Sequence, residues 1–122
     1  MKRKRSVSES FKNAWWGLKT IFTEGRNIKI QCCIGLIAVL LCIFLPVTQL
    51  EWIVILLCCM VVLSLECMNS ALEQVVDLAS PKFHMLAKRA KDFAAGAVLL
   101  ASLFSVIIGG MIFIPYFIQL LG

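Results

Sequence analysis

Four polar side chains recur at helical spacing in an otherwise apolar part of the sequence. Successive members are three, four and four residues apart, and they are Glu66, Asn69, Glu73 and Asp77. Such steps stack side chains on one face of a helix. The run before them, Trp52 to Leu65, contains no charged residue. A carboxylate at the centre of a bilayer costs about 2.5–3.5 kcal/mol on insertion scales, so it is a candidate for function.

A second polar cluster, mainly basic, follows further along the chain. Its members are His84, Lys88, Arg89, Lys91 and Asp92. Carboxylates can hold Mg²⁺ together with phosphate oxygens, and a carboxylate at the membrane could accept a proton from a lipid hydroxyl. Together with cations that neutralise phosphate, these are the parts of a phosphoryl-transfer site. Structural ion pairs and an ion pathway through the membrane are the alternatives.

Several familiar motifs are missing from the sequence. It has no Walker loop, no G-x-G-x-x-G and no protein-kinase H-R-D set, which disfavours the known soluble classes of ATP-using enzyme. The single histidine, His84, gives no histidine-based metal site. The six cysteines form no C-x-x-C pair and are interpreted as small apolar packing residues.

Composition indicates one small integral membrane protein. The chain has 122 residues, of which 61% are hydrophobic, and its length fits a single domain over residues 1–122. Its mean hydropathy is +0.92. The net charge of +5 could suggest nucleic acid, but the basic residues flank apolar runs, which is a membrane-topology pattern. We therefore expect no nucleic-acid partner.

Hydrophobic periodicity predicts an all-α fold with three transmembrane helices and one surface helix. Residues 6–23 read as an amphipathic helix whose Trp15 and Trp16 suit the headgroup level of a bilayer. Membrane spans are expected within residues 28–45, 52–76 and 82–118. Residues 46–51 and 77–80 are the expected connections, with Ser80-Pro81 starting the last helix. Pro115 is expected to kink or end it.

The basic residues predict the topology. All twelve lysines and arginines lie in residues 2–29 or 82–91, and the 46–51 turn and the C-terminal tail have none. The positive-inside rule then places the N-terminus and the 77–92 loop in the cytoplasm, with the C-terminus outside. The acidic stripe and the basic segment are thus expected to meet on the cytoplasmic side.

The stretch from Glu66 to Asp77 resembles the signature of the prokaryotic diacylglycerol kinase and undecaprenol kinase family. The similarity continues through His84 and the segment from Ala87 to Leu99, and Glu24-x-x-Asn27 also resembles the family. It covers residues 8 to 118. The resemblance implies a multi-pass protein of the bacterial cell membrane. It also implies a homotrimer, with active sites shared between subunits at the cytoplasmic interface.

The resemblance also implies the reactants and the site residues. ATP with Mg²⁺ is the phosphoryl donor and a membrane lipid alcohol is the acceptor. Glu66 corresponds to the catalytic base, and Glu24 and Glu73 to the metal ligands. The implied ATP-binding residues are Glu24, Glu73, Lys82, Phe83, His84, Lys91 and Asp92. Those implied for the lipid substrate are Glu66, Asn69, Ala95 and Trp16. Asn13 departs from the family, which often has an aromatic residue there in the nucleotide pocket.

Two lipids compete as the substrate. The sequence of residues 94–99 and the pairing of Glu24 with Asn27 resemble the undecaprenol kinases more closely than the diacylglycerol kinases. Diacylglycerol is the alternative acceptor. The alternative function without enzymatic activity is that of a small structural or ion-conducting membrane protein.

Overall fold

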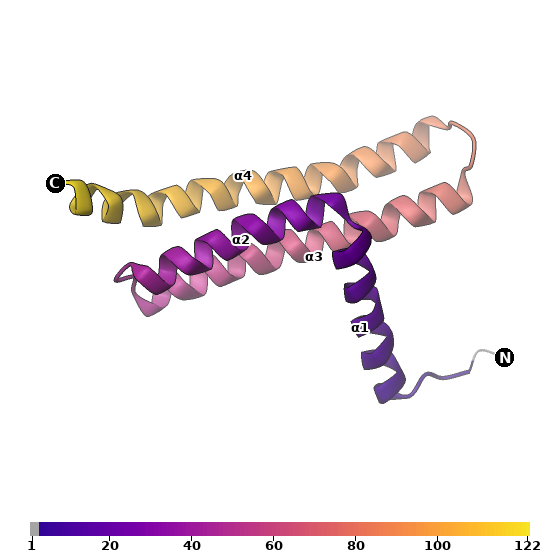
Figure 1. The fold of residues 1–122 in the computed structure, drawn as a ribbon. Coiled ribbons are helices and arrows are strands. Elements are labelled where there is room, and N and C mark those ends of the chain that lie inside the picture. The colour runs from indigo at the N-terminus through magenta and orange to yellow at the C-terminus, as the bar shows by residue number, and fades with distance from the viewer. Residues whose placement is uncertain (1–2) are drawn as a thin grey trace.

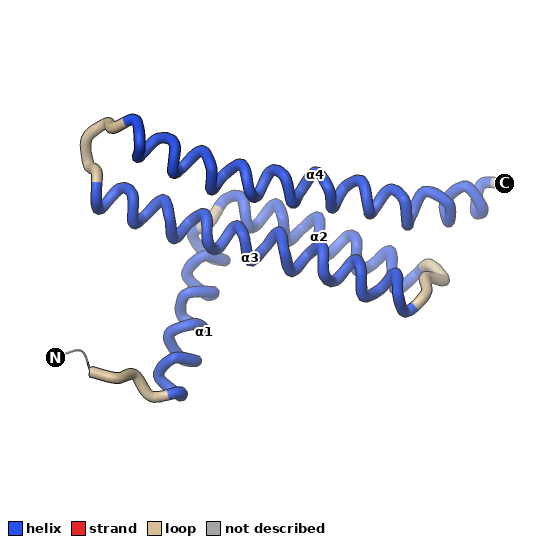
Figure 2. The backbone as a smooth tube through the Cα atoms, turned by 180° about the vertical axis from the view of Figure 1, so that it is seen from behind, coloured by secondary structure: helices blue, strands red, loops and turns tan. Residues whose placement is uncertain are grey.

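A computed structural model of the chain describes residues 3–122 as four helices joined by short connections (Figure 1). The helices are α1 (Val7–Glu24), α2 (Arg26–Phe44), α3 (Gln49–Ala79) and α4 (Met85–Leu121). Helices α2, α3 and α4 are long and apolar enough to cross a membrane, as predicted. They lie side by side, while α1 projects away from them (Figures 1 and 2).

The α3–α4 hairpin is longer than α2. Figure 1 shows that it extends beyond the point where α2 begins, so its far end is covered by neither α1 nor α2. The second half of the acidic stripe and the basic segment both belong to this extension. The charged part of the sequence therefore lies at one end of the bundle, and the apolar part of α3 packs between α2 and α4.

Helix α1 begins at a capping box. The Ser6 hydroxyl oxygen accepts a hydrogen bond of 3.2 Å from the Glu9 amide, and the Glu9 carboxylate accepts one of 3.1 Å from the Ser6 amide. Trp15 and Trp16 are exposed along the helix. The predicted position of α1 on the membrane surface stays a prediction.

A single residue, Gly25, separates α1 from α2. The expected helices over residues 6–23 and 28–45 left residues 24–27 between them, but Glu24 and Arg26 are both helical. A Cβ atom on Gly25 would lie 2.6 Å from the Ile21 carbonyl oxygen and 2.9 Å from Cγ2 of Ile28. Since Ile28 is fully buried, it cannot move aside easily. Gly25 is thus required for the close junction of the two helices.

Gly25→Ala should destabilise the protein. Forcing extra atoms into a packed site costs about 1–3 kcal/mol. The matched control is Gly17→Ala, because a Cβ there meets nothing within 4 Å, and alanine in place of glycine inside a helix stabilises by about 1 kcal/mol. Thermal unfolding should show a lower midpoint for Gly25→Ala and an unchanged or higher one for Gly17→Ala. Equal midpoints for the two variants would contradict this description of the junction.

The turn between α2 and α3 is shorter than predicted. We expected a turn over residues 46–51 and a span starting at Trp52, but α3 begins at Gln49. The reason is a second capping box: the Thr48 hydroxyl accepts from the Glu51 amide at 3.1 Å, and the Glu51 carboxylate accepts from the Thr48 amide at 3.0 Å. The Thr-x-x-Glu pattern is visible in the sequence and could have placed this boundary.

The same end of the bundle is tied together by Tyr116. Its hydroxyl donates a hydrogen bond to the Glu51 carboxylate, which links α4 to α3. Tyr116 also packs against an apolar cluster made of Cys42, Leu45, Ile55 and Phe113. Pro115 was expected to kink or end the last helix, and it does not end it, because α4 continues through it to Leu121. Such prolines are tolerated in membrane helices.

The connection between α3 and α4 also differs from the prediction. Helix α3 runs through Asp77 to Ala79, and Ser80 ends it: the Ser80 amide donates to the Val76 carbonyl at 2.8 Å. The Ser80 hydroxyl donates to the Lys82 carbonyl at 2.9 Å. Helix α4 starts later than the expected residue 82, because Nδ1 of His84 caps it by accepting from the Leu86 amide at 3.0 Å.

Candidate active site

Two polar side chains of α3 are buried in the bundle. Glu66 is 5% exposed and Asn69 is 6% exposed, and across residues 3–122 they are the polar residues that the fold buries. Glu73 and Asp77, one and two turns further along, are exposed. The predicted stripe is therefore divided between a buried half and an exposed half.

A residue of α2 contacts the buried carboxylate. Nε2 of Gln31 donates a hydrogen bond of 3.3 Å to Oε2 of Glu66. On α3 itself, Nδ2 of Asn69 donates one of 3.4 Å to Oε1 of Glu73. One amide thus contacts the buried carboxylate from α2, and the other contacts the exposed carboxylate within α3.

Each of these amides also presents an acceptor that has no donor. Oε1 of Gln31 and Oδ1 of Asn69 are buried and accept no hydrogen bond within residues 3–122. Buried polar atoms in proteins normally have a partner, and an orphaned one is a place for a ligand or an ion. A hydroxyl group or a cation is the kind of partner that an amide oxygen takes.

The acidic and basic segments meet, as the sequence predicted. Nζ of Lys91 on α4 forms an ion pair with the Asp77 carboxylate on α3. Lys88 pairs with Asp92 along α4 at 2.6 Å. Both pairs are largely exposed and therefore screened by water, so they contribute little to stability. Their cations remain available to a ligand that carries more negative charge.

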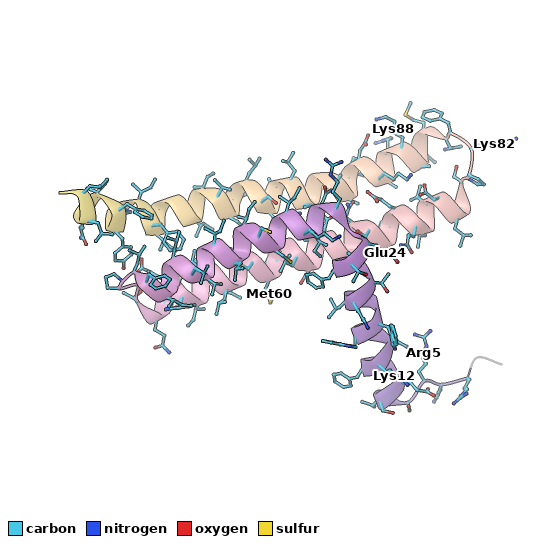
Figure 3. The ribbon with its side chains drawn as sticks, viewed as in Figure 1. Arg5, Lys12, Glu24, Met60, Lys82 and Lys88 are labelled. Carbon is cyan, nitrogen blue, oxygen red and sulfur yellow. The ribbon has the colours of Figure 1, made fainter. Side chains whose placement is uncertain are left out.

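The other residues implied by the family resemblance are spread along the hairpin and α1. Figure 3 shows Glu24 at the end of α1, near α3, whereas Lys82 lies at the far tip of the hairpin. Phe83 and His84 are exposed in the same loop. With a rise of about 1.5 Å per residue, the tip lies about 20 Å along α3 from Glu66. A single chain does not gather all of these side chains around one point.

The lipid-side residues are on two other helices. Ala95 is exposed on α4. Trp16 is exposed on α1, and Nζ of Lys19 lies 5.1 Å from the centre of its ring. No side-chain hydrogen bond within residues 3–122 joins either residue to Glu66, whose carboxylate accepts from Gln31.

The donors present fit a magnesium ion held jointly with phosphate. Residues 3–122 contain no group of three histidine, cysteine, aspartate or glutamate side chains arranged around one point. Mg²⁺ does not require such a cage, because it binds one or two carboxylates, substrate phosphates and water. The Glu73 carboxylate is an oxygen donor of this kind, and Asn69, which donates to it through Nδ2, also carries an amide oxygen that accepts no hydrogen bond within residues 3–122.

An apolar groove runs from Gln31 toward the opposite end of the bundle. It lies between α2, α3 and α4 and has a volume of about 300 Å³. Residues from all three helices line it, among them Gln31, Gly35, Cys59, Ser102 and Phe113. Gln31 therefore stands where the apolar interior meets the buried carboxylate.

The sequence match decides the family. The model of the prokaryotic diacylglycerol kinase family matches residues 12–113. The chain belongs to this family. It is 42% identical over 108 residues to an undecaprenol kinase from Bacillus subtilis, covering 88% of this chain and 87% of that protein. It is 40% identical over 113 residues to a diacylglycerol kinase from Synechocystis, covering 92% of this chain and 65% of that protein.

More distant family members are diacylglycerol kinases too. The protein from Escherichia coli K12 is 32% identical over 94 residues, which is 77% of each chain. This family member is therefore a lipid kinase, and its three apolar helices make it a multi-pass membrane protein of a bacterium. Membership of a lipid kinase family rules out the alternative of a structural or ion-conducting protein without enzymatic activity.

Proposed function

We propose that this lipid kinase transfers the γ-phosphoryl group of ATP to the hydroxyl of undecaprenol, which gives undecaprenyl phosphate and ADP. Diacylglycerol, giving phosphatidic acid, is the alternative acceptor. The observation that carries the proposal is the buried carboxylate of Glu66 beneath an exposed acidic and basic end of the bundle. This is where an apolar alcohol and a soluble nucleotide can approach one another.

Glu66 acts as the general base in this proposal. Its carboxylate takes the proton of the lipid hydroxyl, and the lipid oxygen forms a bond to the γ-phosphorus. The bond between that phosphorus and the bridging oxygen of ADP breaks, and ADP leaves with the electron pair. Burial of Glu66 at 5% exposure keeps water away from the carboxylate, which favours the lipid as acceptor over hydrolysis.

The exposed half of the site would bind the nucleotide. Glu73 and Glu24 would hold magnesium, which when bound neutralises negative charge on the phosphates. Lys91 is paired with Asp77 in this structure and would exchange that partner for a phosphate group. We assign Asp92 and the loop residues Lys82, Phe83 and His84 to nucleotide contacts, on the family resemblance alone.

A homotrimer with shared sites would bring these parts together. Large apolar surfaces remain exposed on all three spans, and the proposed nucleotide loop lies far from Glu66 in its own chain. A neighbouring subunit could supply what a single chain leaves apart. In the membrane we place the N-terminus and the 77–92 loop in the cytoplasm, with α1 on the surface, because the basic residues lie there.

Undecaprenol is preferred as the acceptor for two reasons. The Bacillus undecaprenol kinase shares 42% identity with this chain and is matched over 87% of its own length. The second reason is the resemblance of residues 94–99 to the undecaprenol kinases. Since relatives named for diacylglycerol are almost as similar, the choice needs a direct comparison of the two lipids.

The test presents both alcohols to the purified protein in the same detergent micelles. The ratio of kcat/KM for undecaprenol to that for diacylglycerol, measured with radiolabelled ATP, is expected to exceed about tenfold, equivalent to about 1.4 kcal/mol of transition-state discrimination. A ratio below one would reverse the assignment and make diacylglycerol the substrate.

A further inference from the structure

We propose that Gln31 is a positioning residue that holds the Glu66 carboxylate for proton transfer from the lipid alcohol. This inference rests on the proposed function, in which Glu66 is the base. Its structural support is the contact between Nε2 of Gln31 and Oε2 of Glu66, which joins α2 to α3 across the bundle at 3.3 Å.

The hydrogen bond assigns different tasks to the two carboxylate oxygens. A carboxylate offers two oxygens as acceptors, and Gln31 occupies Oε2. Oε1 is then left to take the proton of the substrate. Without a donor on Oε2 the carboxylate could rotate about its last side-chain torsion, which is broad in glutamate. An interaction that fixes a reacting group raises kcat, because it reduces the range of geometries to be searched.

The packing of α2 makes Gln31 suitable for this task. Ile28, one helical turn before it, is fully buried, and α2 follows directly after the tight junction at Gly25. The first turn of α2 is therefore anchored by a side chain that the fold buries completely. Gln31 thus reaches Glu66 from a fixed element rather than from a loop.

The amide oxygen of Gln31, Oε1, also contributes to the site. Oε1 of Gln31 is buried and accepts no hydrogen bond from residues 3–122, and Gln31 is one of the residues that line the apolar groove. A purely structural link between two helices would not need to leave an acceptor unpaired next to a carboxylate. The unpaired acceptor thus belongs to the same amide that contacts the carboxylate proposed to receive the substrate's proton.

The test uses two substitutions that keep the shape of the side chain. Gln31→Met removes both polar atoms, and Gln31→Glu keeps an acceptor but replaces the N–H donor. Each variant is expected to lower kcat for lipid phosphorylation by about tenfold or more while KM for Mg·ATP stays within about twofold. Gln119→Met is the matched control, since Gln119 is exposed near the end of α4, and it should behave as wild type.

Three results would overturn the proposal. One is a kcat for Gln31→Met within about twofold of wild type. Another is full activity in Gln31→Glu, because the donor would then be dispensable. The last is a fall in thermal midpoint together with a changed KM for Mg·ATP in both variants, which would reduce Gln31 to a structural link. An inactive wild type in the same assay would instead refute the proposed function, and the inference with it, so the two failures are distinguishable.

Discussion

Replacing Glu66 by glutamine is expected to abolish phosphoryl transfer, with kcat reduced by about 10²–10⁴-fold, the usual contribution of a general base. Glutamine has the same shape and can still accept a hydrogen bond from Gln31, so the packing of α2 on α3 should survive. Only the ability to take a proton is lost. The measurement is label transfer from ATP to lipid, together with the thermal unfolding midpoint of the same preparation.

The control for this substitution is Glu9→Gln, which makes the same chemical change in the exposed capping box of α1. It should retain the activity of wild type. If Glu66→Gln transferred phosphate as fast as wild type, Glu66 would not be the base. If it were inactive only because it no longer folded, the thermal midpoint would reveal this, and Glu66→Asp would then test the same role with a carboxylate retained.

The second large effect is expected for Glu73→Gln. Its carboxylate lies in the exposed half of the stripe and accepts from Asn69 at 3.4 Å, which a glutamine oxygen can also do. Loss of one charged ligand should raise the Mg²⁺ concentration needed for half-maximal rate by about tenfold or more, because affinity for hard cations follows ligand charge. KM for ATP should rise with it.

The informative measurement is a magnesium titration of the rate at saturating lipid. Glu73→Gln should regain part of its activity at high Mg²⁺, whereas Glu66→Gln should not respond. The Glu9→Gln protein serves again as the control, with the magnesium dependence of wild type. An unchanged magnesium dependence in Glu73→Gln would remove this residue from the metal site.

Much of the helical architecture was predictable because the signals are local. The apolar runs predict the three long helices, and the three- and four-residue steps from Glu66 predict one polar face. The meeting of the acidic and basic segments followed from antiparallel spans and is confirmed by the contact of Lys91 with Asp77. None of these inferences needed a contact between distant residues to be known in advance.

The predicted ends of the helices were less accurate, for physical reasons. Helix α3 begins directly after Thr48, earlier than the apolar pattern predicted, because the capping box at Thr48 satisfies the first amides of the helix. Ser80 closes one helix rather than starting the next, and His84 provides the cap for α4. Ser80 and Pro81 are residue types that often begin a helix, but the acceptor that caps the first amides of α4 is His84.

Two polar contacts were not predictable from the sequence. Gln31 and Glu66 are 35 positions apart, and Glu51 and Tyr116 are 65 apart. Local spacing contains no information about such pairs. A glutamine inside an apolar run is nevertheless a signal, since it needs a partner in the membrane. The proposed gathering of Glu24 and the 82–84 loop around one site would likewise depend on contacts that no local pattern specifies.

The most direct test of the central claim is phosphate transfer by the purified, folded protein. Wild-type protein in detergent micelles would receive radiolabelled ATP, magnesium and undecaprenol, and the label would be counted in the extracted lipid. We predict labelled undecaprenyl phosphate that requires both magnesium and Glu66. Label in no lipid alcohol, including diacylglycerol, from protein shown to be folded would contradict the assignment of this chain as a lipid kinase with Glu66 as its base.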